Sequence, residues 1–150
     1  MAINEFQVFN QFAIHIGEKK IDLELGTFKM GLVTSTLEPV ATATAVWATW
    51  SGNEVSGTNY DAGGKALTAP ELVLSGAVAT FDATADLVWS QSGTGFSTAR
   101  WGILYEDTAG SDEAVGFLDL GGDVGNVAGD LTIAFNASGI LTITVSDTIA

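Results

Sequence analysis

The spacing of hydrophobic positions changes after about the first thirty residues. Near the N-terminus, Phe6, Phe9 and Phe12 recur at steps of three, and Ile16 follows four positions later, a spacing typical of a helix. These side chains would form one apolar stripe. We expect residues 1–20 to be an N-terminal helix or arm, which packs either on the chain's own core or on a neighbouring subunit.

Beyond this segment the chain consists of short β-type runs separated by Gly, Asn, Asp, Ser and Pro. Residues 28–34 predict a central strand, whereas residues 40–62 hold no strong period and predict a long loop with a helical turn around 45–50. The later runs are KALT, ELVLSG, VATFDA, LVWS, TARWGILYED, AVGFLDLGG, DLTIAFNA and GILTITVS. Their regular succession predicts one mainly β domain over residues 21–150, an antiparallel β-sandwich or jelly roll rather than βαβ units.

Two of these runs support more specific predictions. In LTIAFNASGILTIT, apolar residues alternate in each half and Asn136 to Gly139 supply turn residues, which predicts a β-hairpin. STARWGILYED is apolar on both faces, which predicts a strand covered on both sides. Arg100 lies in this run, and we expect it to pair with a nearby carboxylate.

Charge restricts the class of partner. The 150 residues include 18 Asp and Glu but only 5 Lys and Arg, giving a formal net charge of −13. Residues 101–150 contain acids and no Lys or Arg, so the C-terminal third predicts an acidic surface that favours a basic protein partner. Nucleic acid is not an expected partner, because phosphate would be repelled. Neither a signal peptide nor a membrane span is expected from the hydropathy pattern.

Catalytic and metal-binding patterns are sparse. The chain has one His and no Cys, and it contains neither a GxSxG nor a GxxxxGK[ST] motif, so we expect no enzymatic activity and no catalytic residues. The acidic segment 107–113 lacks the ligand ladder of a calcium loop, and we expect no metal or other cofactor. We expect His15 to be a partly buried residue with satisfied hydrogen bonds.

The aromatic residues provide the candidate interface. Four tryptophans could form a sugar-binding platform, but burial in a core or an interface is the more common fate of this residue. We therefore assign the subunit or capsid interface to five aromatic residues of the N-terminal stripe and the long loop: Phe6, Phe9, Phe12, Trp47 and Trp50.

Three segments carry a resemblance to a known family: EVSGTNYDAGG, ARWGILYEDT and GFLDLGGD. Over residues 21–145 the chain resembles small structural proteins of tailed bacteriophages, of the capsid decoration or cement type. The resemblance implies a non-enzymatic virion protein, made in the host cytoplasm, that binds the outer surface of the head and stabilises it. A tail, neck or fibre component of the same virion is the alternative.

The resemblance also implies partners, namely the major capsid protein and further copies of the chain in a dimer or trimer. It supplies no active-site residue. An outer position agrees with the charge, because acidic residues without compensating bases would be unfavourable beside packaged DNA.

Overall fold

The structure of the chain is a computed structural model that describes residues 5–108 and 110–146. The fold is mainly β, with 38% of residues in strands and 9% in helices, and its sheets are antiparallel. The predicted sandwich-like β domain is therefore confirmed. The jelly-roll variant stays a prediction, because the described strands divide into sheets of five, three and two strands.

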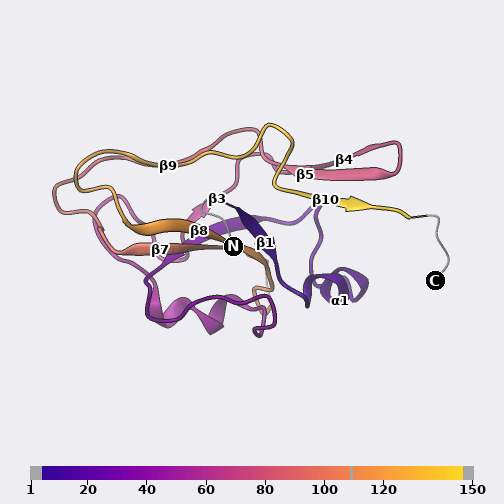
Figure 1. Cartoon of the computed structure of the whole chain (residues 1–150), viewed down its shortest axis with the longest axis horizontal. Helices are drawn as coiled ribbons and strands as arrows, with labels where there is room; N and C mark the ends of the chain where they lie inside the picture. The colour runs from indigo at the N-terminus through magenta and orange to yellow at the C-terminus, as the bar shows by residue number, and fades with distance from the viewer. Residues whose placement is uncertain (1–4, 109, 147–150) are drawn as a thin grey trace.

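The five-stranded sheet forms the centre of the molecule (Figure 1). Its strand β7 (Ala99–Glu106) is apolar on both faces, as predicted, because other layers cover the sheet above and below. Strand β7 pairs without interruption with β2 (Phe28–Val33), from Phe28 opposite Glu106 to Val33 opposite Trp101. In spatial order the strands are β1 (Phe6–Val8), β8 (Ala114–Val124), β7 (Ala99–Glu106), β2 (Phe28–Val33) and β3 (Lys65–Ala66).

A second layer covers one face of this sheet and extends beyond it at one end (Figure 1). Its three-stranded sheet comprises β10 (Leu141–Thr144), β5 (Val78–Asp82) and β4 (Glu71–Ser75), in that order. Its two-stranded sheet comprises β6 (Leu87–Trp89) and β9 (Leu131–Ile133). The main core lies between the two layers and includes Phe28, Leu32, Phe81, Trp89 and Leu104.

The long loop packs on the opposite face of the central sheet. It contains two 3₁₀ turns, η1 (Trp47–Thr49) and η2 (Ser51–Asn53), which confirms the predicted helical turn. Gly31 lets the loop come close, because a side chain at this position would place its Cβ 2.3 Å from the indole of Trp47. A second core forms here, composed mainly of aromatic rings.

The predicted short N-terminal helix is present, but the predicted single aromatic stripe is not. Phe6 lies in the edge strand β1, whereas Phe12 and Ile16 both lie in the short helix α1 (Phe12–Gly17). Residues three apart in extended backbone point to opposite faces, so Phe6 contacts the main core and Phe9 enters the second core. The three phenylalanines therefore form no single stripe, and residues 6–8 are part of the central sheet.

The predicted C-terminal hairpin is also wrong. The turn exists, with the Gly139 N–H donating to the Asn136 carbonyl at 2.9 Å. However, β9 pairs with β6, and β10 pairs with β5. The two strands flanking the turn therefore belong to different sheets, because each finds its partner far away in the sequence.

Candidate interaction surface

The five aromatic residues assigned to an interface lie inside or against the fold. Trp47 stacks on Tyr105 with ring centroids 4.9 Å apart and planes 7° apart, and Trp50 stacks on Phe9 at 4.9 Å. Trp50 and Phe9 are each 1% exposed. Phe12 is buried and Phe6 is partly buried against the main core. A single chain thus leaves little of these rings accessible, and their role as an interface stays a prediction.

The EVSGTNYDAGG segment ties the loop to the central sheet. The Glu54 carboxylate accepts hydrogen bonds from the Tyr60 hydroxyl at 2.8 Å and from the Gly63 N–H at 2.6 Å. The Tyr60 oxygen in turn accepts from the N–H of Leu32 at 2.9 Å, and Tyr105 donates to the Gly63 carbonyl at 2.6 Å. Burial raises the pKa of both tyrosines. These groups hold the backbone in place and do not face a common cavity.

Asn126 joins three loops at one end of the molecule. Its side-chain oxygen accepts from the Phe96 N–H at 2.9 Å, while its amide nitrogen donates to the carbonyls of Thr58 at 3.1 Å and Ser90 at 2.8 Å. The residue is fully buried. Because a buried amide must be satisfied, this set of bonds fixes the relative positions of the loops.

The charged pairs of the central sheet are also structural. Arg100 pairs with Asp119, as predicted, and its guanidinium lies 4.4 Å from the centroid of the Trp101 ring. The hydrogen bond from Arg100 holds the pKa of Asp119 below its usual value. Burial raises the pKa of Glu106, whose carboxylate accepts from the Asp22 N–H at 2.6 Å.

Most basic groups are used within the fold. Lys20 contacts Glu18 at 2.7 Å and Lys29 contacts Asp107 at 2.6 Å. Lys65 donates to the Val88 carbonyl and lies over the Trp89 ring. Since these bases already have partners, the excess acids set the charge that an approaching molecule meets.

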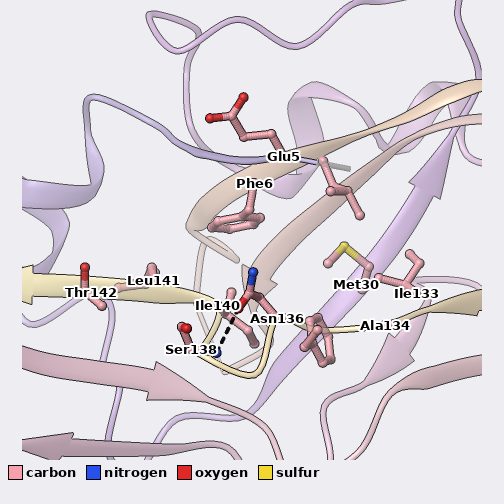
Figure 2. A pocket seen from close by; sticks show the side chains of 13 residues that line it. Glu5, Phe6, Met30, Ile133, Ala134, Asn136, Ser138, Ile140, Leu141 and Thr142 are labelled. Carbon is pink, nitrogen blue, oxygen red and sulfur yellow. Dashed lines mark hydrogen bonds between the residues drawn. The ribbon is translucent and has the colours of Figure 1, made fainter. Parts of the chain in front are cut away.

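A groove of about 650 Å³ opens between β1 and the segment that crosses from β9 to β10. Figure 2 shows Phe6 on one side of it and the turn containing Asn136 and Ser138 on the other. The Asn136 side chain accepts from the Ser138 N–H at 2.8 Å, which fixes this turn. Most of the remaining lining is apolar: Met30, Leu118, Ile133, Phe135, Ile140 and Leu141. The groove could accept apolar side chains, but its lining offers no acid–base pair for catalysis.

The three-stranded sheet at the projecting end, which we call the projecting sheet, has two chemically different faces. Strand register places only apolar residues on one face: Leu72, Leu74, Ala79, Phe81, Leu141 and Ile143. The inner end of this face is buried in the main core, where Phe81 is 0% exposed. Its outer end is uncovered, because Leu74 is 69% exposed.

The outer strand of the projecting sheet has a free edge. β4 pairs with β5 and with no other strand of the described residues. Its sequence, ELVLS, contains no Lys, no Pro and one acid, and the ladder with β5 is free of bulges. Edge strands that avoid pairing with another chain usually carry Lys, Pro, several charges or a bulge. β4 lacks these features, so its edge is open to another strand.

Other chemistry is limited in the described residues. His15 is buried, and its Nδ1 has no hydrogen-bond partner there, so the predicted satisfied histidine is not found. Residues 5–108 and 110–146 contain no group of three or more His, Asp or Glu placed to hold a metal ion. Among these residues no helix has the length and apolarity needed to cross a membrane.

Comparison with known proteins gives no match: no protein family, no curated protein and no solved structure is similar to this chain. Sequence reasoning missed the projecting sheet as a site, although ELVLSG contains three consecutive apolar residues, Leu72 to Leu74, with no basic residue beside them.

Proposed function

We propose that this chain is a non-enzymatic structural protein of a tailed-bacteriophage virion, a decoration protein that binds the outer surface of the head and stabilises it. The structural observation that supports this proposal is the projecting sheet, which carries an uncovered apolar face and an open edge away from the main body. Soluble chains rarely leave such surface exposed unless it binds a partner.

The interior supports a structural role as well. The polar side chains described above, the buried Asn126, the partly buried Glu54 and the Arg100–Asp119 pair, each hold backbone or sheet in position. None of them converges on the groove or on the projecting sheet. A chain built in this way presents surfaces for assembly rather than groups for a reaction.

The charge distribution favours the outside of the head. A chain of net charge −13 would be repelled by packaged DNA, whereas the outer surface exposes it only to protein and solvent. The major capsid protein is the expected partner, through basic groups that face the acids of residues 101–150.

The test uses virions that lack this chain. Purified protein is added to them, and bound copies per particle and the temperature of head rupture are measured. We expect saturable binding at many copies per head and a higher rupture temperature. A ligand that binds only the assembled lattice stabilises each site by about 2.7 kcal/mol at a hundredfold excess over Kd.

Two results would contradict the proposal. Absence of binding to intact heads would exclude a decoration role. A few copies confined to the tail, neck or fibres, with unchanged rupture temperature, would instead support the alternative position in the virion.

A further inference from the structure

We infer that β4 is a self-association site, at which a second copy of this chain adds its own β4 antiparallel to form one continuous six-stranded sheet. The inference rests on the proposed assembly function and specifies a partner for it. Three properties of β4 favour such pairing: the direction of its free hydrogen-bonding groups, its near-symmetric sequence and its low charge.

The backbone N–H and C=O groups along β4 alternate in direction, which leaves those needed to pair with a second strand free. Ser75 and Val78 close a two-residue hairpin in which Gly76 has φ +61°, as the first position of a type II′ turn requires. The closing pair is hydrogen-bonded, and bonded pairs then alternate along the ladder. The N–H and C=O groups of Leu72 and Leu74 therefore point away from β5, toward the open edge.

A two-fold axis at Val73 that relates two copies of β4 fits this alternation. In the antiparallel register centred on Val73, Leu72 of each copy lies opposite Leu74 of the other. Both residues have free backbone groups, so each of the two pairs exchanges two hydrogen bonds. Val73 faces its own copy as a non-bonded pair. Shifting the centre to Leu72 would set Leu74 against Pro70, which has no N–H to donate.

The side chains agree with the same register. On the apolar face, Leu74 gains the side chain of the opposite Leu72 as a neighbour and becomes covered, since it is 69% exposed in one copy. On the other face, Val73, which is 51% exposed, meets its counterpart. The apolar faces of the two projecting sheets then join into one surface.

The low charge of β4 makes it a place where two copies of this acidic chain can approach each other. Two chains of net charge −13 repel each other over most of their surface. β4 carries only Glu71, and the register sets it opposite the uncharged Ser75 of the other copy. Like charges therefore do not face each other across the new ladder, and added salt should strengthen the association by screening the remaining repulsion.

Disulfide trapping tests the register, because the chain contains no Cys of its own. Non-bonded antiparallel pairs bring Cα atoms to about 4.5 Å, within the range of a disulfide. Val73→Cys should give a disulfide-linked dimer under mild oxidation in yields about tenfold above Val88→Cys, an exposed strand residue on β6. A mixture of Glu71→Cys and Ser75→Cys should link as a heterodimer, whereas neither variant alone should.

Sedimentation of the full-length chain provides the second readout. We expect a reversible dimer with Kd on the order of micromolar, since one strand pair buries less area than a standard interface. Leu74→Pro should weaken it by at least about tenfold, because it removes an outward N–H that the β4–β5 ladder does not use. Leu74→Lys is a second variant with the same expected loss. Circular dichroism checks that both variants keep the β fold.

The results separate this inference from the proposed function. A wild-type chain that stays monomeric, together with Val73→Cys yields equal to those of Val88→Cys, would overturn β4 pairing. A dimer that survives both Leu74 variants would overturn it too. Binding of the wild-type chain to virion heads is measured independently, so a decoration role could stand without β4 pairing, and β4 pairing without a decoration role.

Discussion

Replacing Asn126 with Asp changes one atom of a fully buried side chain. The oxygen that accepts from the Phe96 N–H is kept, but both hydrogen bonds donated to Thr58 and Ser90 are lost. The two carbonyls then face a carboxylate instead of an amide.

The expected loss follows from the Thr58 carbonyl, which loses its donor, whereas the Ser90 carbonyl still accepts from the Asn59 side-chain amide at 3.1 Å. An unsatisfied polar group costs about 1 to 3 kcal/mol, so Asn126→Asp should lower the free energy of unfolding by about 1 to 3 kcal/mol through the Thr58 carbonyl, and burial of the new carboxylate adds to this loss. That is a large part of the roughly 5 to 15 kcal/mol that holds a domain folded. Urea unfolding followed by tryptophan fluorescence measures the difference. Lowering the pH should reduce it, because protonating the new carboxyl restores one donor.

Asn136→Asp is the matched control. Asn136 is exposed and uses only its side-chain oxygen, which accepts from the Ser138 N–H at 2.8 Å, and an Asp retains this acceptor. Both variants add one negative charge to the same chain, but the control should stay within about 0.5 kcal/mol of wild type. If the two variants had equal stability, the reasoning that Asn126 holds three loops together would be refuted.

Three further predictions concern the central sheet and its aromatic layer. Burial raises the pKa of Tyr60 and Tyr105, so tyrosinate absorbance should stay flat through the pH range in which free tyrosine ionises and rise only when the chain unfolds in alkali. Since the unfolded chain loses these protons at lower pH than the folded chain, the free energy of unfolding should fall as the pH rises. Arg100→Met should cost about 1 to 3 kcal/mol at neutral pH. The difference in free energy of unfolding between Arg100→Met and wild type should become smaller in acid. The pKa of Asp119 is lowered in the folded chain, so the stability that its ion pair with Arg100 contributes is lost as the pH falls through that pKa. Gly31→Ala should destabilise by about 1 to 3 kcal/mol through overpacking, whereas Gly52→Ala, with open space around its Cβ, should not; equal thermal midpoints would contradict this.

Element positions could be predicted from the sequence because their signals are local. Each of the nine β-type runs identified in the sequence contains a strand, and the two-sided apolar pattern around Ile103 identified the strand with a core on both faces. Turn chemistry was equally readable at Asn136 to Gly139. In these cases the residues that determine the local structure lie next to each other in the chain.

Strand partners could not be predicted in the same way. The residues between Leu131 and Thr144 do not indicate that β9 pairs with β6 and β10 with β5 instead of with each other. That choice depends on packing against residues about fifty positions away. The single aromatic stripe predicted near the N-terminus was wrong for a related reason, although the short helix predicted there is present. A spacing of three fits a helix, but pairing of Phe6–Val8 with β8 imposed extended backbone there.

The interaction surface shows the same limit. Aromatic residues were the reasonable choice for an interface, yet the loop carrying Trp47 and Trp50 found a face of the central sheet to cover. Val73 and Leu74 are among the apolar residues left exposed, and they lie on β4, the last strand of its sheet. Whether a strand lies at an edge is a property of topology, which a local pattern does not contain.

The acidity of the chain gives its two proposed partners opposite responses to salt. A second copy carries the same charge, so it can approach only where acids are few, and screening should favour β4 pairing. A basic capsid partner is attracted by the acids of residues 101–150, and screening should weaken that contact. Raising the ionic strength should therefore increase the dimer fraction in solution while lowering occupancy on virion heads. If both changed in the same direction, the two contacts would not be using the separate surfaces assigned to them.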